Sequence, residues 1–297
     1  MRFILESFRD EGTWPIDTNL ATWNSTLSIN ALSQYPNGLH AAGATASPES
    51  ATDSWNVTLD WLLECQYKTV HPFTGSPPGG WGGWSDLSGS VPDADDTPGA
   101  LLALANLNEQ VEFDDSRKKK IIEAAGEGVR WLLDLQNRDR GWPTFCRGWG
   151  RFPFDRSGAD ITAHVLRALI AWKSQVEGPL AEPKFQSRIE RAIEKGFQFL
   201  DDQQRSDGSW LPLWFGNQDY QEDDNPCYGT AKVLLAYRDA NRFDTQAAEK
   251  GLNWIAANQN DDGGWGGGKS LTRPQTCLLY TSPSPRDQRG SRMPSSA

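Results

Sequence analysis

The stretch Trp131-Leu132-Leu133-Asp134-Leu135-Gln136, followed by Gly141-Trp142, decides the fold because it recurs along the chain. In each complete copy an aromatic residue precedes a glutamine by five positions, and a tryptophan follows that glutamine by six. Two further copies run from Phe199 to Trp210 and from Trp254 to Trp265. An earlier copy begins at Trp61 and contains a longer insertion. Recurrence over such distances indicates a repeat architecture.

The repeat length predicts helical hairpins. Counting a degenerate first copy, the repeats begin at residues 3, 61, 131, 199 and 254. Amphipathic, charged stretches such as 116–137 precede the markers, and shorter, more apolar stretches such as 160–172 follow them. We therefore predict an all-α fold, an incomplete (α/α)6 toroid with polar outer and apolar inner helices. The marker tryptophans are expected to join neighbouring repeats by packing on the glutamine amides: Trp14, Trp81, Trp142, Trp210 and Trp265.

The composition excludes several classes of protein. The 297 residues carry a formal net charge of -10, which argues against a nucleic-acid partner. The four cysteines are widely spaced, so neither a disulfide-dense scaffold nor a clustered-thiolate zinc site is indicated. No run of about 18 apolar residues is present, so no membrane-spanning helix is expected.

Three carboxylates crowd the start of one predicted inner helix, in the run Val91-Pro92-Asp93-Ala94-Asp95-Asp96-Thr97. A helix N-terminus favours their ionised forms, whereas burial and mutual repulsion raise the pKa of at least one. Such a cluster can hold a carboxyl that is protonated at rest and is a strong acid when it reacts. The alternative is ordinary capping of the helix by Asp95 or Asp96.

A second pair, Asp160 and His164, lies one turn apart at the start of the next inner helix. In a toroid the inner helices run in the same direction, so their N-termini meet around one mouth. Asp95 and His164 are therefore expected to approach each other without being close in sequence. The alternative is a purely structural histidine.

These motifs together resemble the squalene–hopene cyclase family. The repeated markers look like its QW repeats, and Asp93-Ala94-Asp95-Asp96-Thr97 matches its Asp-x-Asp-Asp-Thr acid motif. Asp160-Ile161-Thr162-Ala163-His164 is similar to its histidine-bearing segment, and residues 207–230 continue the match in order. The resemblance spans about residues 12–268.

The resemblance implies a class II terpene cyclase in which Asp95 protonates a terminal alkene of squalene or a related polyprene. His164, hydrogen-bonded to Asp95, stabilises the carboxylate left behind, while Asp93 and Asp96 hold and polarise the site. Water is excluded to protect the carbocation, and aromatic faces stabilise the advancing cations. By position, the expected substrate- and cation-lining residues are Trp23, Trp84, Phe145, Asp160 and Trp214.

No metal or organic cofactor is implied, because the protein supplies the proton. The implied partner is an isoprenoid lipid, and family members carry a second α-barrel domain that closes the cavity. They take their substrates from membranes, so the intact protein is expected in the bacterial cytoplasm, peripheral to the inner membrane. The isolated chain is expected to be inactive.

The two ends of the chain depart from the repeat. We expect residues 1–268 to form the catalytic α/α barrel, truncated at both ends, and 269–297 to be a disordered, non-native tail. From Lys269 the chain is basic and rich in serine and proline. The string from Cys277 to Ala297 resembles adapter read-through at the end of a metagenomic reading frame. A natural disordered tail is the alternative.

Other classes of protein stay open on the residues alone. A glycoside-active α/α toroid needs a second carboxylate across the cavity, and none is evident. A non-catalytic repeat scaffold would bind a protein or lipid without using Asp95. A cyclase for a diphosphate-bearing diterpene would add a basic or magnesium site. A prenyltransferase-like zinc site needs an Asp, Cys and His set; Cys227 is available, but the required pattern is absent.

Overall fold

The computed structural model describes residues 20–35, 38–39, 48–72, 74–83, 91–146, 153–175, 177–217, 221–261 and 263–266. The inner helices are α2 (Ala21–Leu32), α5 (Asp96–Gln110), α7 (Ala159–Trp172) and α9 (Pro226–Asp239). The outer helices are α4 (Pro48–Glu64), α6 (Asp115–Leu135), α8 (Pro183–Gln203) and α10 (Gln246–Ala257). Short elements lie between them: β1 (Trp142–Pro143), η1 (Pro153–Asp155), β2 (Ser157–Gly158), η2 (Gly178–Ala181) and η3 (Gln221–Asp223).

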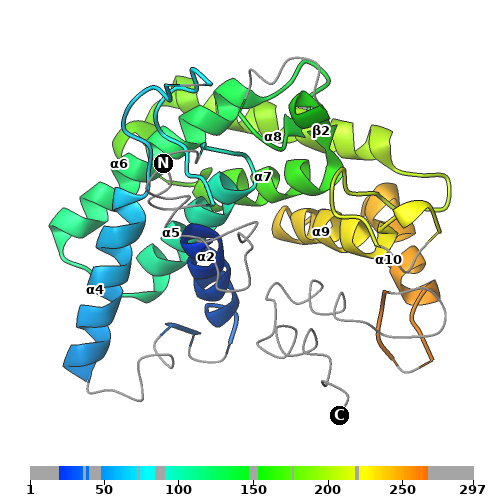
Figure 1. Ribbon diagram of the computed structural model, residues 1–297, viewed down its shortest axis with the longest axis horizontal. Helices are drawn as coiled ribbons and strands as arrows, with labels where there is room; N and C mark the ends of the chain where they lie inside the picture. Colours follow the sequence, from blue (N-terminus) through cyan, green and yellow to red (C-terminus); the bar gives the residue numbers. More distant parts are fainter. Residues whose placement is uncertain are drawn as a thin grey trace, which may run out of the picture.

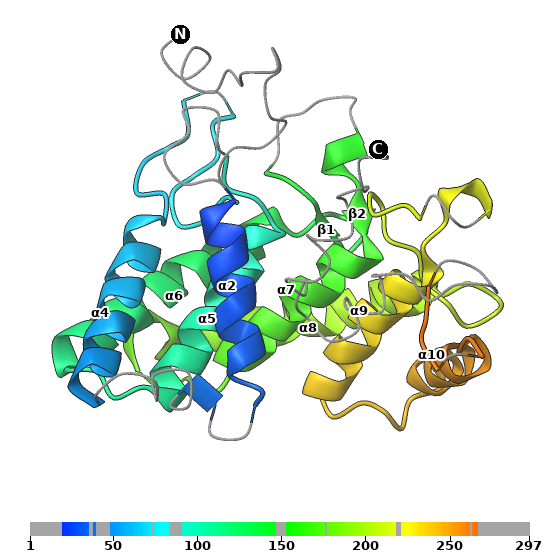
Figure 2. The ribbon, with the colours of Figure 1, turned by 60° about the horizontal axis from the view of Figure 1, so that its bottom comes forward.

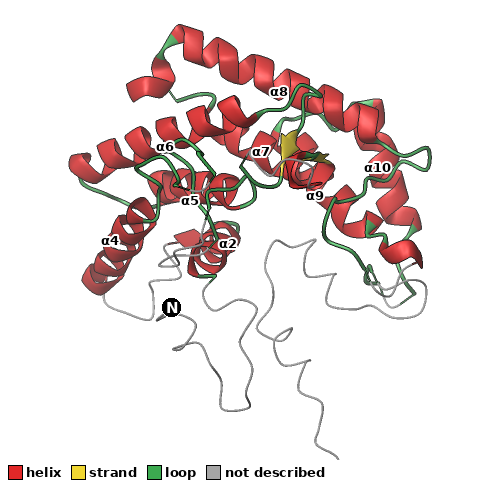
Figure 3. Ribbon diagram, turned by 45° about the horizontal axis from the view of Figure 1, so that its top comes forward, coloured by secondary structure: helices red, strands yellow, loops and turns green. Residues whose placement is uncertain are grey.

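The helices alternate between an inner and an outer layer, and together they form an open arc (Figures 1 and 3). The inner helices pack on one another in chain order, and α5, α7 and α9 pack on α6, α8 and α10. The predicted all-α, incomplete toroid is therefore confirmed. The loops that precede α5 and α7 lie with β1 and β2 at one end of the helices (Figure 2).

The amphipathic pattern of the sequence explains the two layers. On α8 the buried residues recur at helical spacing, as Ile189, Ile193, Phe197 and Leu200 do, while charged residues occupy the other face. In α7 most residues are buried, because neighbours enclose the helix from several sides. The sequence thus assigns α7 to the inner layer and α8 to the outer one.

Each marker glutamine joins two repeats through its side-chain amide. The Nε2 group of Gln66 donates to the carbonyl of Gly79 in its own loop, at 2.8 Å, and to the carbonyl of Ala124 on the next outer helix, at 2.9 Å. Gln136 does the same with Arg140 and Ala192. Gln204 repeats the arrangement with Gly208 and Ala247.

Each marker tryptophan packs on a glycine of the next outer helix. The rings of Trp81, Trp142 and Trp210 are fully buried. A Cβ atom at Gly128, Gly196 or Gly251 would come within 2.8, 3.0 or 2.7 Å of atom Cζ3 of these rings, in the same order. These tryptophans therefore join repeats by packing on glycine, and glycine is required at the contacted position. Their packing on the glutamine amides stays a prediction.

Several sequence-based predictions fall outside the described residues. These are the degenerate first copy with Trp14, the proposed lining residue Trp84 and the tail from residue 269. Within the part of the chain that the structure describes, no helix is both long and apolar enough to span a membrane.

Candidate active site

The acid run is held between the marker loops of two successive repeats. The backbone N–H of Asp93 donates to the carbonyl of Trp81, and that of Ala94 donates to the carbonyl of Thr144, both at 2.9 Å. Asp93 also forms an isolated β-bridge with Phe145. The position of the carboxyls is thus set by the loops that carry Trp81 and Trp142.

Asp93 caps helix α5. Its Oδ1 atom accepts hydrogen bonds from the backbone N–H groups of Asp95, at 3.0 Å, and Asp96, at 2.6 Å. Asp95 occupies the N-cap position without a capping bond from its side chain. The alternative interpretation, in which the side chain of Asp95 or Asp96 caps the helix, is therefore wrong. The Asp95 carboxyl makes no capping bond.

Asp93 and Asp96 form a buried carboxyl pair. Burial raises the pKa of Asp93 to about 6, against the opposing effect of hydrogen bonds that include one from Asp96. Burial, followed by the negative charges of Asp93 and Asp95, raises the pKa of Asp96 well above its ordinary range. The pair is therefore expected to hold a proton, located mainly on Asp96.

Asp95 has the properties of a proton donor. Burial raises its pKa to about 8; the charge of Lys232 opposes this rise, and the charges of Asp93 and Asp160 add to it. The carboxyl of Asp95 is therefore protonated at neutral pH. Its side chain lines a cavity of about 350 Å³.

Four aromatic residues line this cavity together with the acids: Phe145, Phe154, Trp214 and Phe215. Phe154 contacts the edge of Phe145, with ring centroids 5.2 Å apart, and tilts on Trp214 at 5.1 Å. The Trp214 indole Nε1–H donates to Thr144 Oγ1 at 2.5 Å, which anchors this aromatic lining to the loop beside the acid run. The predicted lining residues Phe145 and Trp214 thus meet the predicted acids.

The expected hydrogen bond between His164 and Asp95 is not formed. No hydrogen bond joins its ring to any residue that the structure describes, and Nδ1 is buried without a partner. Its Nε2 atom lies 3.6 Å from the position that a Cβ atom would take at Gly99, on the neighbouring helix α5. Burial, with the charges of Lys232 and Arg167, holds the pKa of His164 well below its ordinary range, so the ring is neutral.

Asp160 is buried beside this histidine. Its carboxyl lies near backbone N–H groups that include that of Ile161, yet neither oxygen makes a hydrogen bond of regular geometry with the described residues. Burial raises its pKa. Trp23 is half-buried on α2 and does not line the cavity, where Leu20 lies instead.

Four residues of the site were not predicted from the sequence. Phe154 lies in the short helix η1 and Phe215 in a loop, and periodicity gives no signal for such short or irregular segments. Tyr228 and Lys232 stand on α9 at the places that Asp160 and His164 hold on α7, and an alignment of the repeats would have found both.

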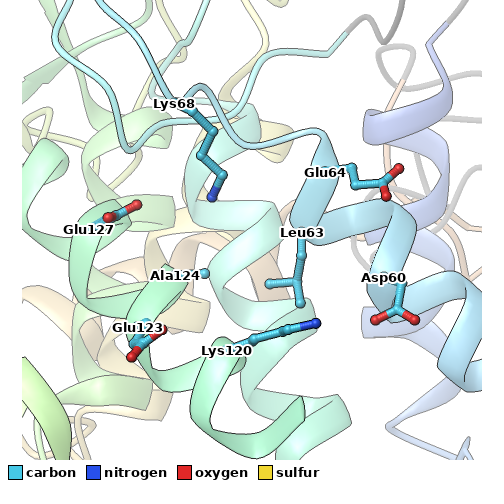
Figure 4. A pocket seen from close by; sticks show the side chains of 8 residues that line it. All are labelled: Asp60, Leu63, Glu64, Lys68, Lys120, Glu123, Ala124 and Glu127. Atoms are coloured by element: carbon cyan, nitrogen blue, oxygen red, sulfur yellow. The ribbon is translucent and has the colours of Figure 1, made fainter. Parts of the chain in front are cut away.

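A larger hollow of about 630 Å³ lies on the outer surface between α4 and α6 (Figure 4). Acidic side chains such as Asp60 and Glu127 line it together with Lys68 and Lys120. The glutamine bridge from Gln66 to α6 crosses the same seam between repeats. Because charges of both signs line this hollow and a structural bridge crosses it, we interpret it as the boundary between two repeats.

Over the described ranges, no cluster of three metal-ligating side chains is arranged around one point.

The chain folds as an arc of α/α hairpins, a fold shared with solved type II terpene cyclases, and holds a buried acid run beside an aromatic-walled cavity. Residues 23–284 match the squalene–hopene cyclase C-terminal domain, and the chain belongs to this family. It is 29% identical over 282 residues to enfumafungin synthase of Hormonema carpetanum, covering 86% of this chain and 19% of that protein. It is 28% identical over 264 residues to the squalene–hopene cyclase of Bradyrhizobium diazoefficiens, covering 82% and 34%. The chain thus spans between a fifth and about a third of these relatives.

Solved structures share the fold. The type II terpene cyclase MstE from Scytonema, in complex with geranylgeranyl dihydroxybenzoate as substrate, superposes with a TM-score of 0.50 at 17% identity, covering 94% of this chain and 68% of that one. A possible member of the GH105 family from Klebsiella pneumoniae superposes with a TM-score of 0.59 at 15% identity, covering 94% and 73%. The fold alone therefore does not separate terpene from glycoside chemistry, and the family match favours the former.

Proposed function

We propose that this chain supplies the proton donor of a polyprene cyclase. The observation that carries the proposal is the Asp95 carboxyl, which makes no capping bond and lines a cavity with aromatic walls. Burial raises its pKa to about 8, which favours the protonated form at neutral pH. Asp95 gives its proton to a terminal alkene, whose π electrons form the new C–H bond. A tertiary carbocation forms on the substrate, and a carboxylate remains on Asp95.

The cavity lining suits this chemistry. The rings of Phe145, Phe154 and Trp214 offer π faces to a cation without the negative charge that would capture it. The Asp93–Asp96 pair keeps the donor in place through the start of α5. The proposed substrate is an isoprenoid lipid such as squalene, which the longer protein takes up as a peripheral protein at a membrane surface.

The direct test is turnover of squalene by the longer protein that contains this segment, with cyclic hydrocarbons detected by mass spectrometry. Asp95→Asn should lower turnover by at least about 100-fold, because a general acid contributes on that scale or more. Asp160→Asn is the comparison, since it removes a neighbouring carboxyl that is not the proposed donor. Equal turnover by wild type and Asp95→Asn would remove the assignment of the acid.

The pH dependence gives a second readout. Only protonated Asp95 can act as the donor, so turnover should fall as the pH rises above about 8. A profile that instead rises through this range would assign the reaction to a group that acts as a base.

A further inference from the structure

The three inner helices that follow the markers share one register. In each, the backbone N–H of the marker tryptophan donates to a threonine hydroxyl on the next inner helix, at 2.9 to 3.0 Å. The bonds are Trp81 to Thr97, Trp142 to Thr162 and Trp210 to Thr230. These threonines therefore mark equivalent points on α5, α7 and α9.

The shared register defines two sets of equivalent residues near the mouth. Two positions before the threonines stand Asp95, Asp160 and Tyr228. Two positions after them stand Gly99, His164 and Lys232. The contact between Nε2 of His164 and the Cβ position of Gly99 supports this alignment. Lys232 is thus the counterpart of His164 on the next inner helix.

The side chain of Lys232 extends back toward the start of α9. Its Nζ atom lies 5.7 Å from the centroid of the Tyr228 ring, which stands one turn earlier on the same helix. The side chain is half-buried and makes no ion pair with the described residues within 4.0 Å. The positive charge of Lys232 therefore acts on neighbouring charged groups over distances longer than that of an ion pair.

The charges that surround Lys232 are few. Burial lowers the pKa of Lys232, and the negative charges of Asp95, which precedes α5, and of Asp160, on α7, oppose this effect by favouring the charged form. Arg167, also on α7, repels it. The charge of Arg167 is compensated by an ion pair with Asp239, with Nε and Oδ2 2.6 Å apart. Of these two cations, Lys232 is thus the one whose charge acts on Asp95 and Asp160 and that has no ion-paired carboxylate among the described residues.

We infer that Lys232 is the positive charge that stabilises the Asp95 carboxylate after the proton has left, a role that the neutral His164 does not fill. The inference rests on the proposed function for the identity of the proton acceptor. The O–H bond of Asp95 breaks, its proton joins the alkene carbon, and the ammonium group faces the resulting anion. Lys232 is a positioning residue in this sense, because it acts through Asp95.

The titration of Asp95 tests the inference on the chain itself, without turnover. Infrared spectroscopy follows the carboxylic C=O band with pH, and its loss in Asp95→Asn assigns the band. Wild type should titrate near pH 8. Lys232→Met should raise the midpoint by roughly 1–3 pH units, because the opposite charge is lost, and Lys232→Arg should restore it. Lys195→Met, on the exposed face of α8, is the control and should leave it unchanged.

The inference would be overturned if Lys232→Met left the Asp95 titration midpoint unchanged while unfolding at the same temperature as wild type. In the longer protein, the same variant should lower kcat more than it raises KM, and Lys232→Arg should recover kcat. A loss of turnover with an unchanged Asp95 midpoint would give Lys232 a structural role instead. If wild type turns over no polyprene, the proposed function fails, whereas the midpoint still decides the question of Lys232.

Discussion

The indole Nε1–H of Trp142 donates to the carbonyl oxygen of Leu132, ten residues earlier, at 2.7 Å. Trp210 makes the same ten-residue bond to Leu200, and Trp265 makes it to Ile255. Each bond turns the chain back on the last turns of an outer helix, and the rings of Trp142 and Trp210 pack against the following outer helix. The repeat marker is therefore a structural unit that sets where the next inner helix begins.

The glycines under the tryptophan rings should tolerate no side chain. In Gly128→Ala the new Cβ would come within 2.8 Å of Trp81 Cζ3 and 3.1 Å of Leu101 Cδ2, so we expect a loss of about 1–3 kcal/mol in the free energy of unfolding. Gly126→Ala, on the same helix α6, meets its nearest atom at 3.4 Å and should be neutral or slightly stabilising. Urea denaturation of both variants measures the difference. Equal midpoints would contradict the close contact.

The glutamine bridges should contribute to the free energy of unfolding in proportion to their burial. Gln66→Met leaves the carbonyls of Gly79 and Ala124 without this donor inside the protein and should cost about 1–3 kcal/mol. Gln259 is exposed, and its amide donates to the carbonyl of Gly263 in its own loop. Gln259→Met should therefore change the unfolding midpoint less. A larger effect at Gln259 would show that the bridge between repeats is not what the marker glutamine contributes.

The sequence predicted the architecture because the repeat marker is local. Gln136 and Trp142 lie six residues apart, so their spacing is visible in the chain although they also contact the next repeat. The separate roles of the acid-run carboxyls were not predictable, because they depend on which carboxyl turns toward the N–H groups of α5. The effect of the Lys232 charge on Asp95 is likewise a tertiary property, because α5 and α9 are separated by a whole repeat.

Asp160 should make the protein less stable as the pH rises. Its folded pKa lies above the ordinary value of 3.8, so above about pH 4 the folded state binds more protons than the unfolded state and loses stability. Asp160→Asn removes this dependence and should be more stable than wild type by about 1–3 kcal/mol at pH 8, but by less at pH 5. Hydrogen bonds from Ser209 lower the pKa of Asp207 against the opposing effect of partial burial, so its contribution to stability is lost only below about pH 4. Asp207→Asn is therefore the control and should change stability equally at pH 5 and pH 8. Urea midpoints at the two pH values are the measurement.

Substitutions of Asp93 and Asp95, at the start of α5, should separate effects on stability from effects on catalysis. Asp93→Ala removes the acceptor for the N–H groups of Asp95 and Asp96 and should cost about 0.5–2 kcal/mol, the usual range for a lost N-cap. Asp93→Asn keeps an acceptor oxygen and should recover most of that loss. Asp95→Asn leaves the cap intact and removes a buried acid, so its stability at neutral pH should equal or exceed that of wild type.

Thermal unfolding of the three variants, followed by circular dichroism, provides the comparison. Because the same Asp95→Asn protein is the inactive variant in the turnover test, a stable and well-folded sample assigns its loss of activity to the missing proton. If Asp95→Asn unfolds as readily as Asp93→Ala, Asp95 also supports the helix, and the loss of turnover no longer identifies it as the donor.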